Sequence, residues 1–307
     1  MFQFIVRRII QLIPVLIGVS ILVFSLMHIT PGNPAHIIAG ESAPVETVKQ
    51  IEERLGLNDP ITVQYFRFVK NAAQLEFGNS WRTSLPVSTE IQSRFWVTLE
   101  LAIYSTIFSI ILGLIAGIIS AVRQYSFTDI TIMLVALFGL SMPNFWLGLM
   151  LMNWFAVNLE WLPATGWGTP SQIVLPVITL GTGGAAIIAR MTRSSMLDVI
   201  SQDYIRTARA KGVRERIVIY RHALKNALIP VVTVVGLQFG GLLSGAVLTE
   251  SVFAINGMGK LIIDRIMARD FPVVQASILI ISVIFVLVNL IVDISYRFLN
   301  KRVDLDS

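Results

Sequence analysis

The sequence contains no cysteine and few charged residues. Its 307 residues include 14% Asp, Glu, Lys and Arg, whereas about 25% is usual in a soluble domain. Without cysteine the chain can form no disulfide, thiolate metal site or iron–sulfur centre. Hydrophobic residues reach 54%, and the mean hydropathy is +0.72. Because so few charges cannot cover a soluble globule of this size, the composition indicates a polytopic membrane protein.

Motifs for catalysis are lacking as well. The only histidines are His28, His36 and His222, and their spacing is not that of a metal site. No GxSxG or HExxH motif occurs, and the stretch Gly257–Lys260 is too short to cradle a phosphate as GxxxxGK[ST] does. The sequence therefore predicts no enzyme, no catalytic residue, no metal and no cofactor in this chain. If it takes part in active transport, the energy comes from another polypeptide.

Six stretches lack any Asp, Glu, Lys or Arg, and each exceeds the roughly 20 apolar residues that a membrane helix needs. They are Ile9–Ile29, Leu101–Val122, Ile130–Leu159, Trp161–Ala189, Asn226–Thr249 and Phe271–Val292. We therefore predict an all-α fold with six transmembrane helices. Breakers and interfacial aromatics place a loop at Trp161–Pro170, so the fourth helix is expected to start near Ile173.

No ionisable residue lies at predicted mid-membrane depth, where it would mark a proton relay or an ion path. Glu100, Asp129, Glu250 and Asp293 fall at or near span ends, where water or lipid headgroups can solvate them. A structural role is the simpler interpretation of these four residues. Proton- or sodium-coupled transport is weakened, although an ion-coupled carrier that uses polar residues stays open as an alternative.

Lys and Arg are distributed unevenly among the loops. With the N-terminus inside, most of them fall on the inner side, and much of the remainder lies in one long loop that weighs little in orientation. Both termini are therefore predicted to be cytoplasmic. The chain divides into the N-terminus and first helix (1–29), an extracytoplasmic cap (30–95) and a five-helix core (96–307). The cytoplasmic loop of this core spans 191–225.

The cap has the sequence signals of a folded structure. Pro44–Leu55, followed by Gly56, is typical of a short helix with Pro near its start and Gly just beyond its end. Pro60–Leu75 predicts a second helix, because its apolar residues recur on one face. We therefore expect a small folded cap rather than a flexible linker.

Within the spans, glycines recur at the spacing that lets helix backbones approach closely. The pairs are Gly113 and Gly117, Gly236 and Gly240, and Gly241 and Gly245. Tight packing is the simplest interpretation, and a fifth span that packs on two partners or slides is the functional alternative.

Pro143 interrupts the third span, where it removes one backbone hydrogen bond and frees a carbonyl group. This predicts a kink, and a bend beside a substrate path is the functional alternative. The residues that we expect as candidates for lining such a path are Ser141, Pro143, Asn144, Gln238, Gly240, Gly241 and Ser244.

The cytoplasmic loop is strongly basic and has a helix–glycine–helix pattern. Asp203–Gly212 predicts a short helix that is capped by Ser201 or Asp203 and ended by Gly212. A second helix is expected to run from about Glu215 into the membrane. Such a loop is either a rigid docking element for a cytoplasmic partner or a positive loop that touches anionic lipid.

Nine short stretches along the whole chain form a recognisable set. They are Arg7-Arg8, Pro31–Pro34, Leu55–Pro60, Arg190–Leu197, Asp203–Gly212, His222–Ala227, Thr249–Phe253, Gly257–Gly259 and Arg269–Gln275. Together they resemble the membrane subunits of binding-protein-dependent ABC importers, specifically the B-type permease of the dipeptide, oligopeptide and nickel branch.

The resemblance implies a type I importer permease that pairs with a homologous permease around one pathway in the bacterial inner membrane. It implies two cytoplasmic ATPase subunits, which bind ATP and Mg, and an extracytoplasmic binding protein. The implied substrates are di- and oligopeptides, with nickel or another small ligand such as glutathione as the alternative. The cap is expected to contact the binding protein and help gate ligand release, and sealing the lipid interface is its alternative role.

The permease signature of such importers is Glu-Ala-Ala, three residues, Gly, nine residues, and Ile-x-Leu-Pro. Gly212 anchors this pattern here, Arg206 stands in the Glu slot, and Lys225 stands where the final Pro is expected. This departure resembles the peptide and nickel branch. The ATPase-coupling residues that the resemblance implies are Asp203, Tyr204, Arg206, Thr207, Ala208, Arg209, Ala210, Lys211 and Gly212.

Within this coupling helix, Ala208 is expected to permit close approach of an ATPase, while Tyr204 anchors in an apolar pocket. Arg206 and Arg209 are expected to supply charges at the rim of the contact. On this interpretation, Ala208→Glu uncouples the ATPases without unfolding the six spans.

We predict that the purified chain by itself neither binds nor hydrolyses ATP, because it has no phosphate-cradling loop. Binding of labelled ATP and release of phosphate by the purified chain are the measurements. Saturable hydrolysis in a preparation free of other polypeptides would contradict the prediction.

Overall fold

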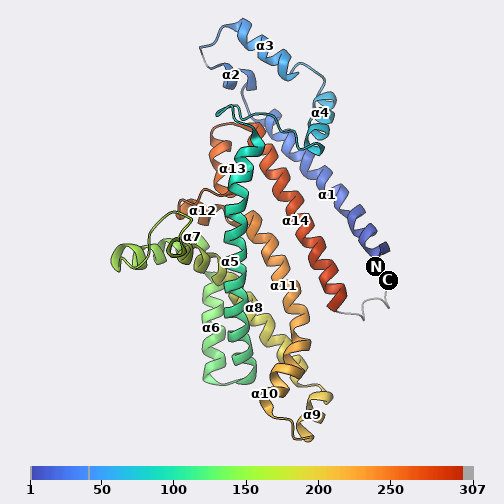
Figure 1. The fold of residues 1–307 in the computed structure, drawn as a ribbon, viewed down its shortest axis with the longest axis vertical. Helices are drawn as coiled ribbons and strands as arrows, with labels where there is room; N and C mark the ends of the chain where they lie inside the picture. Colours follow the sequence, from blue (N-terminus) through green and yellow to red (C-terminus); the bar gives the residue numbers. More distant parts are fainter. Residues whose placement is uncertain (1, 41, 300–307) are drawn as a thin grey trace. The chain divides into compact units, whose positions relative to one another are not determined.

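The computed structural model describes residues 2–40 and 42–299, and these residues form helices joined by short loops (Figure 1). The only β-type pairing in the described part is an isolated bridge between Asn79 and Pro86. Contacts divide the chain into two compact units. The first is Met1–Thr98 with Asn256–Val286, and the second is Leu99–Ile255 with Leu287–Ser307.

The first unit contains the N-terminal helix, the cap helices, the segment before the last helix and the first part of that helix. Its elements are α1 (Phe2–Ile29), α2 (Pro34–Ala39), α3 (Val45–Leu55), α4 (Ile61–Ala73), the start of α5 (Val87–Val122), α13 (Met258–Met267) and the first part of α14 (Phe271–Leu299). The two predicted cap helices are confirmed as α3 and α4. Gly56 ends α3 with a φ of 65°, as the glycine signal indicated. The short helix α2 was not expected from the sequence.

A buried polar network holds the loop before α5 against the corner between α13 and α14. The carboxylate of Asp270 is fully buried and accepts hydrogen bonds from Ser80 Oγ (2.5 Å) and the backbone N–H of Trp81 (3.0 Å). Arg265 donates to Glu90 Oε2 at 2.9 Å and lies 3.9 Å from Asp270. Residues 256–286 therefore group with the cap, whereas segmentation by sequence assigned them to the five-helix core.

The second unit is a helical bundle centred on α8. Its elements are the rest of α5, α6 (Phe127–Ser141), α7 (Asn144–Leu151), the π-helix η1 (Met152–Asn158), α8 (Pro170–Ile200), α9 (Asp203–Ala210), α10 (Glu215–Ile217), the π-helix η2 (Val218–Ala223), α11 (Leu224–Gly245), α12 (Val247–Val252) and the end of α14. The central helix α8 packs against α6, α7 and α11 (Figure 1). It starts at Pro170 rather than near Ile173, because Thr169 and Gln172 form a capping box ahead of the apolar run.

Among residues 2–40 and 42–299, five helices are long and apolar enough to cross a membrane, and the predicted third span is a bent pair. Its two parts, α6 and the α7–η1 segment, meet at an angle of 103°. A proline disfavours the helical conformation of the residue before it. Met142, which precedes Pro143, is accordingly extended, with a ψ of 128°. The expected kink at Pro143 is therefore confirmed, but it breaks the span into two helices of different direction.

The paired glycines of α5 form its contact with α8. A Cβ added to Gly113 would lie 2.7 Å from the Ile188 side chain and 2.8 Å from the carbonyl oxygen of Ala185. At Gly117 the same atom would lie 2.6 Å from the carbonyl oxygen of Ala189. The two backbones therefore approach as closely as the spacing predicted. In α11, Gly236 similarly lies against Val292 of α14, whereas a Cβ at Gly241 would meet nothing within 4 Å.

We predict that Gly113→Ala lowers the free energy of unfolding by about 1–2 kcal/mol, because overpacking outweighs the helix propensity gained. Thermal unfolding of the detergent-purified protein is the measurement. Gly183→Ala is the matched control, since it adds a methyl group where nothing lies within 4 Å. Equal stability of the two variants would show that α5 and α8 are not in close contact.

Candidate functional site: the α9 loop and the α8 pocket

The predicted loop helix is present as α9, but its start differs from the prediction. Neither Ser201 nor Asp203 caps it, because the N-cap is Gln202, without a side-chain hydrogen bond, and the Ser201 hydroxyl donates to Asp198 O. Asp203 is the first helical residue, where its charge favours the positive helix end. Gly212 follows the helix with a φ of +76°, a conformation that costs other residues about 1 kcal/mol or more. The end at this glycine is therefore as predicted.

The inner face of α9 belongs to the core of its own chain. Ile205 is fully buried and Ala208 is only 8% exposed. Both pack in a cluster with Ala121, Met196, Val218, Ile219, Ala223 and Ala227, which come from α5, α8 and the helices after α9. The expectation that small Ala208 permits close approach of an ATPase is therefore wrong, because helices of the same chain already cover this residue.

Polar contacts fasten the other sides of α9. The Asn226 amide donates to Tyr204 Oη at 2.8 Å, and Arg209 makes a two-pronged ion pair with Glu215, at 2.6 and 3.1 Å. Hydrogen bonding to this carboxylate raises the pKa of the Arg209 guanidinium above its ordinary value. The ion pair of Arg209 therefore links two parts of the loop, and the exposed Tyr204 side chain is held at its hydroxyl group by Asn226. The α9 loop (residues 201–223) is consequently a stiff projection.

The outer face of α9 stays exposed. Besides Tyr204 and Arg209, which are hydrogen-bonded within the chain, the exposed residues are Asp203, Arg206, Thr207, Ala210 and Lys211. The helical residues among them, 203, 206, 207 and 210, follow the spacing of one helix face. Any partner of this loop therefore meets these side chains rather than Ala208.

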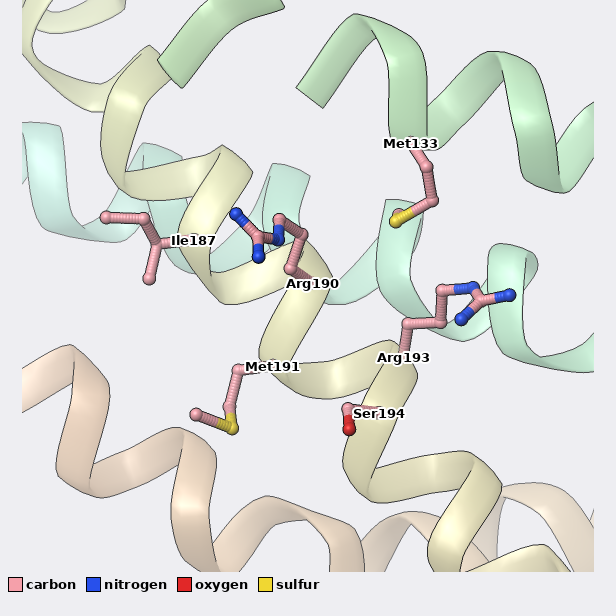
Figure 2. A pocket seen from close by; sticks show the side chains of 6 residues that line it. All are labelled: Met133, Ile187, Arg190, Met191, Arg193 and Ser194. Carbon is pink, nitrogen blue, oxygen red and sulfur yellow. The ribbon is translucent and has the colours of Figure 1, made fainter. Parts of the chain in front are cut away.

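A second feature is a cavity of about 470 Å³ on α8, which we call the α8 pocket. It is lined by Met133 of α6 and by Ile187, Arg190, Met191, Arg193 and Ser194 of α8. Figure 2 shows Met133 pointing from α6 toward α8, while the guanidinium groups of Arg190 and Arg193 point apart. Arg190–Leu197 carries part of the family resemblance, but none of its residues was expected from the sequence to form a site.

The two arginines of the α8 pocket differ in their partners. Arg193 binds the carboxylate of Asp129 through two hydrogen bonds, of 2.7 and 2.6 Å. Ser120 and the backbone N–H of Tyr125 also donate to that carboxylate. Arg190 is exposed, and within the described part of the chain it has no hydrogen bond or ion pair. The free positive charge of the pocket is therefore that of Arg190.

The ion pair corrects the expectation for Asp129. This residue was expected at a span end solvated by water or headgroups, but it is 3% exposed. A buried carboxylate needs such partners, because leaving it unpaired costs several kcal/mol. The pair thus fixes the α5–α6 turn against α8, which is the structural role that the sequence suggested.

The residues expected along a pathway are not gathered in the α8 pocket. Ser141, Pro143 and Asn144 are exposed at the bend between α6 and α7. Gln238 of α11 donates to Gly184 O of α8 at 3.4 Å. Of the remaining three, Gly240 is buried, Gly241 is exposed, and the side chain of Ser244 lies outside the described part. Their role as pathway lining stays a prediction.

Comparison with known proteins gives the family of this architecture. Residues 110–305 match the family described as the inner membrane component of binding-protein-dependent transport systems, and residues 1–102 match its N-terminal family. The chain belongs to this family. The resemblance inferred from the short motifs is thereby confirmed, and the chain is a multi-pass membrane transport component.

Two relatives match over the full length of this transport component. It is 47% identical to the dipeptide transport system permease protein DppB of Alkalihalophilus pseudofirmus, with 99% of both chains covered. It is 45% identical to the glutathione transport system permease protein GsiC of Escherichia coli K12, also with 99% of both chains covered.

A solved structure supports the fold. An inward-facing structure of the MetNI methionine ABC transporter matches with a TM-score of 0.59 and 20% identity, over 68% of this chain and 96% of that chain. The importer-permease architecture predicted from the sequence is therefore confirmed.

We predict that Ala208→Glu destabilises this transport component, because the carboxylate enters an apolar cluster without a partner. The expected loss is about 2–3 kcal/mol, measured as thermal unfolding in detergent. Ala210→Glu is the matched control, since Ala210 is exposed two residues further along the same helix. Wild-type stability of Ala208→Glu would contradict the burial of this face.

Proposed function

We propose that this chain is one of the two permease subunits of an ATP-driven importer for di- and oligopeptides. The observation that carries the proposal is the full-length similarity to a dipeptide permease and a glutathione permease. The stiff α9 loop supports it, because a transport subunit without a nucleotide site must receive force from a partner. A flexible loop that only touches lipid would not need an apolar core of its own.

In this assembly a homologous permease completes the pathway, and two ATPase subunits bind ATP and Mg. The exposed face of α9 docks in a groove of one ATPase, with Arg206 at the rim of the contact. Its buried face transmits the movement, since Ile205 and Ala208 pack on side chains from α5 and α8. Both termini and the α9 loop are then cytoplasmic, and the membrane is the bacterial inner membrane.

The cap faces the binding protein in this arrangement. Its described part contains a cavity of about 380 Å³ that is lined by Arg54, Trp81 and neighbouring residues. Trp81 is held in place by the buried carboxylate of Asp270 and by an edge-on contact with Phe271. Such an ordered surface suits a protein that must receive a partner and take over its ligand. A cap that only seals the lipid interface is the alternative.

Glutathione is the second candidate substrate, and similarity to GsiC is the observation that favours it. Glutathione is itself a peptide-like molecule with free carboxylates, so the same membrane pathway suits both substrates. Nickel import has no such support from the two relatives described above. An ion-coupled carrier offers no reason for a docking helix.

Reconstitution tests the proposal. Vesicles that contain this chain, its partner permease, the ATPases and the binding protein should take up a labelled tripeptide only when ATP is supplied. We predict that Arg206→Glu reduces both uptake and co-purification of the ATPases by tenfold or more, in a salt-dependent way. Arg123→Glu, which reverses a charge on the α5–α6 turn, should leave both unchanged.

Two outcomes would count against this proposal. Uptake that proceeds without ATP but follows an ion gradient would indicate the carrier alternative. Wild-type assembly and uptake by the Arg206→Glu protein would mean that α9 does not dock on the ATPases. Competition by unlabelled glutathione, measured in the same vesicles, distinguishes the two substrate classes.

A further inference from the structure

The α8 pocket has a composition that the established family membership does not explain. It combines the guanidinium of Arg190, which has no partner among the described residues, with the hydroxyl of Ser194 and three flexible or branched apolar side chains. The second arginine does not add free charge, because Asp129 neutralises it through two hydrogen bonds. The pocket therefore presents a single positive group beside an apolar wall.

The charged side chain of Arg190 is not expected to face the hydrocarbon of the membrane. Arg190 lies within α8, about 30 Å along the helix axis from Pro170. A charged side chain that faces lipid tails is costly, so such residues turn toward water, a polar cavity or a partner. Arg193, one turn further on, is tied to the start of α6 by the ion pair. Arg190 therefore faces the cavity, about one helical turn before the residue of α8 that pairs with the start of α6.

An open strip continues from the pocket along α8. Gly183, Ile187, Arg190 and Ser194 recur at the three- and four-residue spacing of one helix face. A Cβ added to Gly183 would meet nothing within 4 Å, so no described residue of the chain touches this face there. The strip runs along α8, which packs against both α6 and α11. This open face of α8 leads along the helix to the positively charged guanidinium of Arg190.

We propose that the α8 pocket binds the C-terminal carboxylate of the peptide during its passage, with Arg190 as the residue that recognises it. This inference rests on the proposed function. A guanidinium matches a carboxylate with two parallel N–H···O hydrogen bonds, and the Ser194 hydroxyl supplies a further donor. Met133, Met191 and Ile187 contact the adjoining residue, and methionine adapts to side chains of different shape. The pocket thus selects for a free carboxyl end while tolerating varied sequence.

The test compares trialanine with trialanine amide, which differ only at the carboxyl end. Binding of both is measured by equilibrium dialysis to the detergent-purified complex of permeases and ATPases, without the binding protein. We expect the wild-type complex to bind trialanine roughly 10-fold or more tightly than the amide. Arg190→Gln should abolish this preference, and Arg190→Lys should retain part of it. Arg123→Gln, which removes a charge at the nearby turn, should leave the preference intact.

Transport in vesicles separates failure of this inference from failure of the proposed function. ATP-dependent uptake of trialanine by the wild-type assembly tests the function, whereas the acid-to-amide preference tests the pocket. If uptake occurs but the wild-type complex binds both peptides equally or not at all, the pocket assignment is wrong. The pocket assignment is equally wrong if Arg190→Gln weakens the binding of both peptides by the same factor. If instead the activity of the wild-type assembly, but not that of the Arg190→Gln variant, follows the phosphatidylglycerol content of the vesicles, the pocket binds a lipid phosphate and the proposal is wrong.

Discussion

The close contact between α5 and α8 determines how the rest of the second unit is arranged. Lipid tails are as apolar as the side chains of these helices, so no hydrophobic force drives the helices together, and backbone proximity must supply the packing. Gly113 and Gly117 permit that proximity because a side chain at either position would overlap α8. The position of α8 in turn sets the ion pair at Arg193, the pocket around Arg190 and the start of the α9 loop.

The α9 loop owes its stiffness to side chains that point inward. A helix of eight residues is not stable alone in water, yet Ile205 and Ala208 complete an apolar cluster that includes Ala121 of α5. The Arg209–Glu215 pair and the Tyr204–Asn226 hydrogen bond close the loop on either side. A load on the exposed face of α9 is therefore carried into the bundle by packed contacts. The buried residues of α9 thus fix the conformation of the loop, while the residues on its exposed face are available to a partner.

In the first unit, hydrogen bonds to two acidic side chains fix the conformation of a segment that has little regular secondary structure. The segment between α4 and α5 is largely irregular, and its backbone includes Ser84 with a φ of 60°. Ser80 and Trp81 bind the buried Asp270, while Thr83 and Arg265 bind Glu90. Two acidic residues thus order a loop by accepting hydrogen bonds from it. Removing either carboxylate would leave buried donors without partners, which is why such networks tolerate few changes.

Much of this protein was determined by its sequence alone. Runs of apolar residues gave the spans, the glycine spacing gave the α5–α8 contact, and the short motifs gave the family, because each of these signals is local or periodic. The tertiary structure decided which face of a helix is covered. It buried Ala208 inside its own chain, paired Asp129 with a residue 64 positions away, and gave Arg190 no partner in the described part of the chain. Such pairings depend on which distant segments meet, and neither periodicity nor local propensity contains that information.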